Sequence, residues 1–530
     1  MDKRGWRKMG LAVSAVVMLF VAACGGQGGS DGEAAAGTAA GTATDAADAE
    51  KVLTIALSQD VDTFDTHNTT AISTEAVLVN LQSYLLKRDR ESKVQPHLAE
   101  SYESVDDVTW SFTLRDNITF HNGDPLTAED VKFSLERVAL DNKLVQHQNY
   151  KTIKEVKVID DTHFEIITNG PDPVLPYRIA REASGIFPKK YIEEVGWEGY
   201  LKHPIGSGPY KFVEWRKGDR LVLSKYENYF AGDVTEWDTV VFRTIIENST
   251  RIGEALTGGV DIASSIPPTD LERVENNEGT SVIPNDTTTV MMLMVNQNPQ
   301  FKTSDPKVRE AIDYAIDKQA LIDKFTDGTA APTRTRIVPG VPGFEESLYN
   351  TFRYDPERTK QLLAEAGYDE SNPLEITYTA SQGRSYADSE IAQMIAGMLE
   401  AAGIKVNLQL LEASQYVDVR TNGKNAELLG TGWNNTMFDP SLALIHFHST
   451  YNPKGFGYNN PLVDELLDKA AVNMNPEERA EQYKQVQRIA AEELPYIYLY
   501  RSNEYYSVSD GIDFTPRVDS MFYVEEIKSK

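Results

Sequence analysis

The stretch Leu428 to Ser441, LLGTGWNNTMFDPS, carries the residues whose chemistry best suits holding a small molecule. Trp433 offers a flat apolar face and one hydrogen-bond donor, a combination that suits stacking on a peptide side chain or a sugar ring. The polar residues that follow it are Asn434, Asn435, Thr436 and Asp439. We expect a short strand to run out into this loop, and α/β proteins commonly bind ligands at strand ends. The alternative is a core tryptophan followed by a polar turn.

Two roles are open for Asp439, which is followed by Pro440. Its carboxylate could contact a ligand. An aspartate before a proline is also a common helix N-cap, since the carboxylate accepts hydrogen bonds from the first free amides and proline fits the first helical position. Both roles stay open at the level of the sequence, and the N-cap is the commoner one.

Two further groups could recognise a ligand. Arg384, in SQGRSYADSE, lies upstream of an expected helix, and its guanidinium could bind a carboxylate through two parallel hydrogen bonds. A solvated loop arginine is the alternative. His446 and His448, in ALIHFHS, fall on opposite faces of the helix expected there, and no third ligand is evident beside them. We therefore expect no resident metal.

No catalytic motif accompanies these residues. The sequence contains no H-E-x-x-H metal motif and no P-loop. Its 80 Asp and Glu residues are too many for counting to exclude a glycosidase pair, so a hydrolase remains the rival function class. We expect a binding protein that is not an enzyme and needs no cofactor.

The amino-acid composition limits the classes of partner and site that the protein can have, and the chain length indicates the number of lobes. With 52 Lys and Arg against 80 Asp and Glu, the net charge of −28 argues against a nucleic-acid partner, and no basic patch opposes this. The one cysteine, Cys24, excludes disulfides within the chain and a cysteine-based zinc site. A chain of 530 residues exceeds what one core serves, so we expect two or three lobes.

The N-terminus has the pattern of a secretory leader. Basic residues precede an apolar run, 11–20, which is shorter than the roughly 20 residues of a membrane span. The small residues before Cys24 resemble a bacterial lipobox, which implies a signal peptide over 1–23 and a lipid on Cys24 that holds the protein on the membrane. Residues 24–50 lack aromatic and large aliphatic side chains, so we expect a flexible tether.

The elements expected around these residues alternate between strands and helices. In Asp106 to Val138, apolar residues alternate as in a strand, HNGDP turns the chain, and Thr127 caps a helix. After Asn296, Asp-Pro and Asn-Pro pairs open helices, and Ile404 to Leu410 alternates as a strand. Helices interleaved with strands favour an α/β lobe with a substantially parallel sheet.

The amino-acid sequence of residues 110–134 closely resembles a family signature, W-x-F-x-L-R-x-x-I-x-F-H-[ND]-G-x-P-[LF]-[TN]-A-x-D-V-x-[FY]-[ST]. It belongs to the oligopeptide/dipeptide/nickel-binding family of extracytoplasmic solute-binding proteins, solute-binding family 5 of the ABC importers. The segments GSGPY, 206–210, and EALTGGVDIA, 254–263, resemble other motifs of the family. The likeness covers most of the chain after about Lys51.

This resemblance implies an α/β fold of the periplasmic-binding-protein type, with lobes joined by a two-crossing hinge and an extra inserted domain. The segments expected are lobe I from 51–83, 206–296 and 502–530, inserted domain II from 84–205, and lobe III from 297–501. It also implies that the loop 60–70, with Asn68 in it, lies beside the ligand. Lobes that close on a ligand are a known switching mode, because the ligand binds the closed state better.

The resemblance implies a monomer outside the cytoplasm. Its implied partners are a small solute, for which a peptide is the favoured class, the subunits of an ABC permease, and the membrane, which it reaches through the lipid anchor. One residue departs from the peptide binders. Their loop reads W-x-x-D-x-x-[DE]-P, and its first aspartate pairs with the peptide ammonium, but Thr436 stands there in this chain. A threonine cannot neutralise a buried ammonium. A neutral oligosaccharide or a nickel chelate is therefore kept as an alternative ligand.

Overall fold

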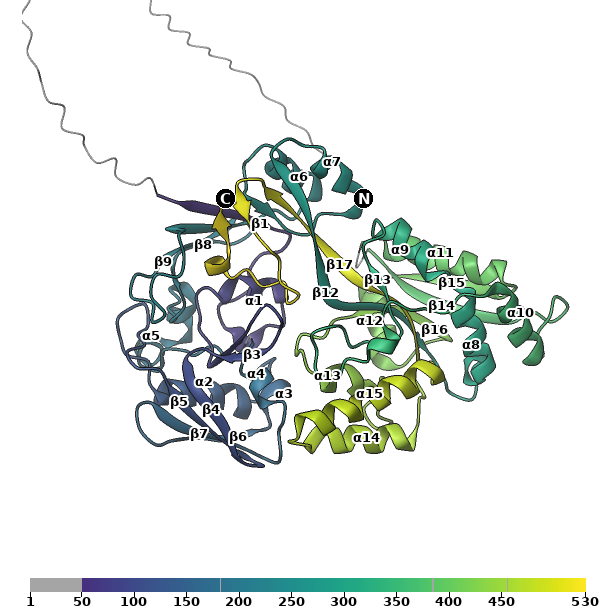
Figure 1. Ribbon diagram of the computed structural model, residues 1–530, viewed down its shortest axis with the longest axis horizontal. Helices are drawn as coiled ribbons and strands as arrows, with labels where there is room; N and C mark the ends of the chain where they lie inside the picture. Colours follow the sequence, from purple (N-terminus) through teal and green to yellow (C-terminus); the bar gives the residue numbers. More distant parts are fainter. Residues whose placement is uncertain (1–49, 182, 384–385, 455) are drawn as a thin grey trace, which may run out of the picture. The chain divides into compact units, whose positions relative to one another are not determined.

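The computed structural model describes residues 50–181, 183–383, 386–454 and 456–530. The expected signal peptide, Cys24 and all but the last residue of the expected tether lie outside the described residues, as does Arg384. Figure 1 shows the described elements coloured from purple at the N-terminal end to yellow at the C-terminal end. Within this part of the chain, no helix is long and apolar enough to cross a membrane.

The largest sheet among the described residues has eleven strands and is mixed. In spatial order its strands are β15 (Lys405–Glu412), β14 (Glu375–Gln382), β16 (Leu428–Trp433), β12 (Thr280–Val295), β17 (Tyr496–Ser509), β11 (Ile262–Ala263), β1 (Val52–Leu57), β10 (Thr239–Thr244), β9 (Arg220–Lys225) and β8 (Tyr210–Arg216), while β13 (Ala331–Pro332) pairs with β17. Among its strands from the predicted lobe III, only β15, β14 and β16 pair in parallel. The substantially parallel sheet that we predicted there is therefore confined to three strands.

Two long antiparallel strands, β12 and β17, join the two halves of this sheet, and Figure 1 shows them side by side. The pairing register shifts between Asp286 and Val290, so the ladder is irregular where the chain crosses from one half to the other. The first part of β12 is not evident as a strand from the sequence. Residues 280–289 are mostly polar and include Pro284, which is why their strand character does not show in the alternation.

The half of the sheet beyond the crossing is covered by helices on both faces. Helices α8 (Pro306–Ala315), α10 (Pro356–Glu365) and α11 (Asp388–Ala401) contribute to one apolar cluster, and α13 (Pro440–Leu444), α14 (Pro461–Val472) and α15 (Pro476–Glu493) contribute to another. Along β12, Leu293 packs in the first cluster, whereas Met292 and Met294 pack in the second, as the two-residue period of a strand requires. Met292 and Met294 are thus core residues.

Local capping explains where these helices begin. The side chains of Asp305, Asp355 and Asn475 each accept a hydrogen bond from a backbone amide of the first turn, and a proline follows each of them. These three predicted helix starts are confirmed. The same chemistry starts α2 (Ala128–Leu140), where Thr127 and Asp130 form a capping box.

A separate antiparallel sheet and helix α2 together carry the family signature. Its order is β4 (Ala99–Asp106), β5 (Thr109–Leu114), β7 (His163–Thr168) and β6 (Ile153–Val158), with α2 packed against it. Trp110, Phe112 and Leu114 of β5 are buried, which confirms the predicted alternation. This sheet lies in the predicted inserted domain, but the exact domain boundaries stay a prediction.

The remaining helices and strands of the described residues are short or connect these layers. They are α1 (Ile72–Leu78), α3 (His147–Tyr150), α4 (Leu175–Arg178), α5 (Lys189–Lys202), α6 (Asn248–Leu256), α7 (Leu271–Glu275), α9 (Lys318–Phe325), α12 (Ala413–Asn422), β2 (Leu86–Arg88), β3 (Val94–Pro96), β18 (Ile512–Asp513) and β19 (Lys528–Ser529). A hairpin of β8 and β9 follows the GSGPY segment.

The glycines of GSGPY serve a close approach of two backbones. A Cβ on Gly206 would lie 2.0 Å from the carbonyl oxygen of Leu81, and one on Gly208 would lie 2.4 Å from that of Asn80. The backbone amide of Gly208 also donates to Leu81 at 3.0 Å. Only glycine fits there, so the close packing of the two backbones explains both glycines of this segment.

Candidate ligand-binding site

A cleft of about 950 Å³ is lined by residues from both halves of the large sheet. This volume lies in the range of small-molecule sites. Ser58 and Ser265 line it on the side of β1, and Trp433 and Thr436 line it on the side of β16. Because both halves contribute, a movement of one half relative to the other would change the contacts that the cleft offers.

Three residues predicted for ligand contact line this cleft, namely Trp433, Asn434 and Thr436. The structure places them at the end of β16, as predicted from the strand and loop pattern. The guanidinium of Arg336 lies 4.8 Å from the centroid of the Trp433 ring, and His446 makes an edge contact at 4.4 Å. A ligand can therefore stack on Trp433 only where Arg336 leaves the ring open. Contact with a ligand stays a prediction for all three residues.

Two residues of the same loop are turned away from the cleft. Asn435 is 1% exposed, and its side-chain amide donates to the backbone carbonyl of Asp439 at 3.2 Å. Asp439 is 0% exposed, accepts from the amide of Ser441, and receives two hydrogen bonds from Arg479 at 2.6 and 2.7 Å. The helix-cap interpretation of Asp439 is confirmed, while ligand contact by Asn435 or Asp439 stays a prediction that these contacts do not favour.

Asn68 lies in an exposed position outside the residues that line the cleft. Its side-chain amide donates to Asp65 at 2.7 Å, and Asp65 forms an ion pair with Arg137 of α2 at 2.8 Å. The geometry thus gives Asn68 a local structural role, and ligand contact stays a prediction. The other expected contact, Arg384, is outside the described residues.

The two histidines have different neighbours, but only His446 lies in a helix, the 3-10 turn Ile445–Phe447, and His448 follows it in an extended conformation. His446 contacts Trp433 and Arg336, and burial, followed by the charge of Arg336, lowers its pKa to about 3, so its imidazole is neutral at pH 7. His448 lies 3.2 Å from Asp468 of α14. Across the described ranges, no group of three or more His, Cys, Asp or Glu side chains could hold a metal ion.

The cleft also contains charged residues that the sequence analysis did not single out. These are Glu75, Arg88, Arg251, Arg420, Glu504 and Asp519. Arg251 donates to backbone carbonyls and to Asn248, and Asp519 pairs with Arg517 at 3.0 Å. Both are therefore engaged within the protein.

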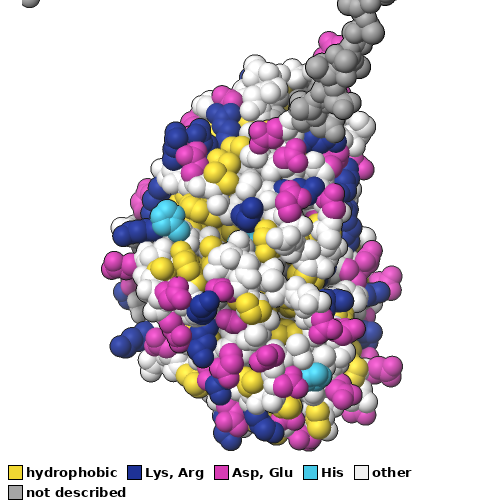
Figure 2. All heavy atoms as spheres, turned by 90° about the vertical axis from the view of Figure 1, so that its left-hand side faces the viewer, with side chains coloured by type: hydrophobic (Ala, Val, Ile, Leu, Met, Phe, Trp, Pro, Cys, Tyr) yellow, Lys and Arg dark blue, Asp and Glu magenta, His cyan; other side chains and the backbone are white. Residues whose placement is uncertain are grey.

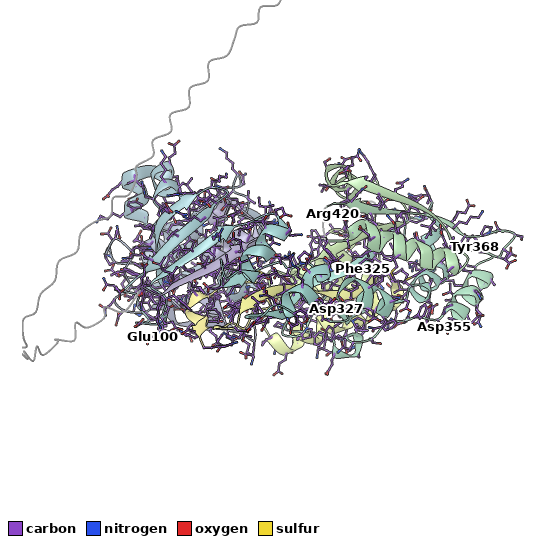
Figure 3. The ribbon with its side chains drawn as sticks, turned by 90° about the horizontal axis from the view of Figure 1, so that it is seen from above. Glu100, Phe325, Asp327, Asp355, Tyr368 and Arg420 are labelled. Atoms are coloured by element: carbon purple, nitrogen blue, oxygen red, sulfur yellow. The ribbon has the colours of Figure 1, made fainter. Side chains whose placement is uncertain are left out.

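Arg420 and Glu504 also line the cleft, and neither forms an ion pair with another of the described residues. Arg420, on α12, is half-buried, and no hydrogen bond or ion pair joins it to another residue of the described ranges. Figure 3 labels it together with Phe325, another residue of the cleft wall. Glu504, on β17, accepts hydrogen bonds from hydroxyl groups alone, and burial raises the pKa of its carboxyl group.

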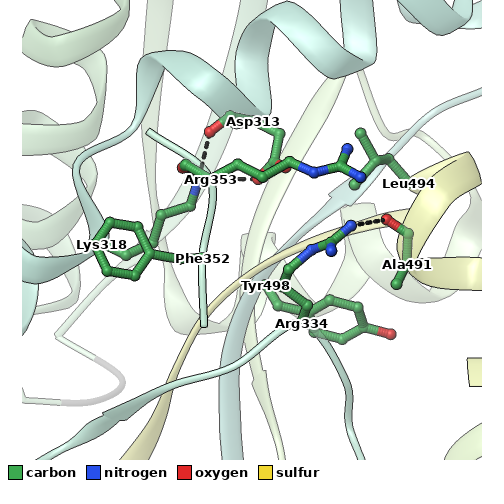
Figure 4. Close-up of a pocket in the computed structure, with 8 residues that line it drawn as sticks. All are labelled: Asp313, Lys318, Arg334, Phe352, Arg353, Ala491, Leu494 and Tyr498. Atoms are coloured by element: carbon green, nitrogen blue, oxygen red, sulfur yellow. Dashed lines mark hydrogen bonds and ion pairs between the residues drawn. The ribbon is translucent and has the colours of Figure 1, made fainter. Parts of the chain in front are cut away.

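A second cavity, drawn in Figure 4, is a structural feature and leaves no room for even a water molecule. It surrounds a buried ion pair in which the ammonium of Lys318 donates to Asp313 at 2.8 Å and to the carbonyl of Arg353 at 2.9 Å. Burial lowers the pKa of Lys318, and the carboxylate of Asp313 opposes this. The pair connects α8 and α9 and offers no binding site.

Residues 93–455 match the family model described as bacterial extracellular solute-binding proteins, family 5 middle. The chain belongs to this family. The resemblance found in the sequence is thereby confirmed, and the protein binds a solute rather than catalysing a reaction. The family's description places its members outside the cytoplasm.

Relatives of this family-5 protein agree in sequence and in fold. A glutathione-binding protein, GsiB of Escherichia coli O157:H7, is 30% identical over 88% of this chain and 92% of its own. Two solved structures share the fold at lower identity. The unliganded open form of the periplasmic murein tripeptide binding protein MppA has a TM-score of 0.78 and 22% identity over 91% and 97% of the two chains. The oligopeptide-binding protein AppA of Bacillus subtilis, in complex with a nonapeptide, has a TM-score of 0.71 and 24% identity over 91% and 99%.

The large net charge of this family-5 protein is not gathered into one visible patch. Figure 2 shows one face of the molecule, on which Asp and Glu side chains are interspersed with Lys and Arg. Elsewhere in the described residues, opposite charges also form ion pairs, such as Lys87 with Glu525 and Lys157 with Glu165. On this face, the acidity is a property of the solvated surface.

Proposed function

We propose that this protein captures a peptide or a peptide-like solute in the cleft of about 950 Å³ and delivers it to an ABC permease. The observation that carries the proposal is the composition of the cleft wall. It offers an aromatic ring in Trp433, a carboxylate in Glu504 and a guanidinium in Arg420. A ring, an anion and a cation match the side chain, ammonium and carboxylate of a peptide.

The relatives make a peptide the first candidate. Their names describe binding of glutathione, a murein tripeptide and a nonapeptide. All three ligands contain amino acids. The size of the cleft agrees with a solute of this kind, because sites for small molecules span about 300–1,000 Å³.

Delivery requires that the loaded protein differ from the empty one. A ligand can favour the closed state only through contacts that improve on closure. The lining of the cleft supports this, because Ser265 and Trp433 lie on opposite sides of the crossing formed by β12 and β17, so that closure would bring both towards one ligand. The irregular register between Asp286 and Val290 gives these strands a place to bend.

The lipid anchor belongs to the same proposal. It is supported by the sequence pattern before Cys24 and by the run of small residues that follows it up to the first described residue, Glu50. A tether of about 26 residues would span roughly 25–30 Å if it behaves as a flexible coil. That reach suits a protein that must meet a permease in the same membrane.

A neutral oligosaccharide is the second candidate, and Thr436 is the observation that favours it. This residue lines the cleft where peptide-binding relatives carry an aspartate. Titration calorimetry of the purified protein against peptides and against neutral oligosaccharides separates the two. Heat of binding from peptides alone supports the proposal, and heat from oligosaccharides alone overturns it. Chemical change of a bound compound would instead indicate a hydrolase.

A further inference from the structure

Glu504 is a carboxylate in the cleft wall that has no positive charge beside it. The hydroxyl of Tyr506 donates to its Oε2 at 2.8 Å, and the hydroxyl of Ser520 donates to the same oxygen at 3.1 Å. The hydroxyl of Ser265 donates to Oε1 at 3.4 Å. No ion pair joins Glu504 to a Lys, Arg or His of the described residues.

The other carboxylates of the cleft are already engaged. Asp519 shares the guanidinium of Arg517, and the two side chains are almost fully buried. Glu75 has an interaction of its own within the chain. Glu504 differs from Asp519, because the groups that donate to it are hydroxyls, which carry no charge.

An uncompensated carboxylate in a partly buried wall carries a cost. Hydroxyl donors replace part of its hydration, but they bring no opposite charge, and closure of the cleft around a ligand would remove still more water. A cationic group on the ligand would remove this cost, because a hydrogen bond between two charged groups is among the strongest available. The longer contact at Oε1 marks the oxygen with the greater capacity to accept another donor.

We propose that Glu504 binds the ammonium group of the ligand, which makes the preferred ligand a peptide with a free amino group. This inference rests on the proposed function, and it narrows the ligand class. In peptide-binding relatives the anion for this group comes from the loop position that Thr436 occupies here. In this chain the anion would come from the crossing strand β17, whose Glu504 also lines the cleft.

The test compares two peptides in two proteins. The probe is the tightest-binding member of a panel from dipeptides to nonapeptides, used with a free and with an acetylated amino terminus. Calorimetry gives the affinity of each form for the unaltered protein and for Glu504→Gln, which keeps the shape and removes the charge. We expect the unaltered protein to prefer the free amine by about tenfold or more. In Glu504→Gln this preference should disappear while the acetylated peptide binds as before.

Asp519→Asn is the matched control, because its carboxylate lines the same cleft and is already paired with Arg517. This variant should retain the preference for the free amine. A preference that survives unchanged in Glu504→Gln overturns the inference and leaves the peptide proposal standing, whereas a panel with no binding peptide removes the proposed function itself. Should Glu504→Gln bind neither form, Glu504→Asp must restore the preference for the amine, and its failure to do so also overturns the inference.

Discussion

Replacing Asp439 by alanine tests whether this residue anchors the ligand loop or touches the ligand. Its two carboxylate oxygens accept hydrogen bonds from Arg479 at 2.6 and 2.7 Å, and the two side chains are 0% and 7% exposed. Removing one partner of a buried, paired charge costs about 3–5 kcal/mol, because the other charge stays buried without it. Loss of the N-cap of α13 adds about 1 kcal/mol. The expected loss is therefore about 4–6 kcal/mol of unfolding free energy.

Unfolding in urea, followed by tryptophan fluorescence and circular dichroism, measures this loss. Asp439→Asn is the matched variant, because it keeps the shape and an acceptor for the amide of Ser441 while it removes the charge that Arg479 needs. We expect a smaller loss of unfolding free energy for Asp439→Asn than for Asp439→Ala, and little change in the affinity of either variant for a ligand once it is folded.

The opposite pattern would refute this reasoning. If the unfolding free energy of Asp439→Ala lies within about 1 kcal/mol of that of the unaltered protein, the buried pair is weaker than its geometry implies. A loss of ligand affinity in Asp439→Asn at unchanged stability would make Asp439 a ligand contact after all. Such a result would require the loop to open away from Arg479 when the cleft is occupied.

Three further predictions concern the site, the anchor and pH. Trp433→Ala should weaken ligand binding by about 1–3 kcal/mol in calorimetry, and an unaltered affinity in a folded variant would place the ligand elsewhere. Cys24→Ser should move the protein from the membrane fraction to the soluble fraction, and unchanged fractionation would contradict the lipid anchor. Burial raises the pKa of Glu504 above its usual 4.5, so the folded state binds this proton more tightly than the unfolded state. The resulting stabilisation is fully present below pH 4.5 and is lost as the pH rises through the raised pKa. Unfolding measured against pH should show this component in the unaltered protein and not in Glu504→Gln.

The helix starts could be predicted from the sequence because their chemistry is local. A cap such as Asp305, Asp355 or Asn475 bonds to an amide two or three residues later, and the proline that fits the first turn stands next to it. The extent of β12 could not be predicted in this way. Residues 280–289 are held in the sheet by pairing with β17, more than 200 residues later in the chain, and not by an apolar pattern of their own.

The same difference between local and long-range contacts explains which residues of the candidate site could be predicted. Trp433 was predicted because a tryptophan at the end of a short strand is visible in the sequence. Arg479, the partner of Asp439, lies 40 residues further along, and Ser265 lies 239 residues from Glu504, so neither contact leaves a local trace. A signal for Glu504 did exist. It is a carboxylate within YRSNEYYSV, a strand otherwise rich in tyrosine, where a charge calls for a structural or functional reason.

The position of Glu504 has a consequence for how a ligand would drive closure. Glu504 pairs with Asn285 of β12 next to the irregular register, so it lies at the crossing itself. A group at the crossing would move little if the halves of the sheet approached each other, whereas Trp433, which lies beyond the crossing on β16, would move with its half. Contacts that are equal in the open and closed states add affinity without favouring closure. An ammonium on Glu504 would therefore hold the peptide in the open cleft, and the contact with Trp433 would supply the difference that closes it.

On this reasoning, Glu504→Gln should weaken binding and leave the degree of closure of the loaded protein unchanged, while Trp433→Ala should reduce closure. Small-angle X-ray scattering at saturating peptide distinguishes the two, and a loss of closure in Glu504→Gln would show that the crossing is not a fixed point.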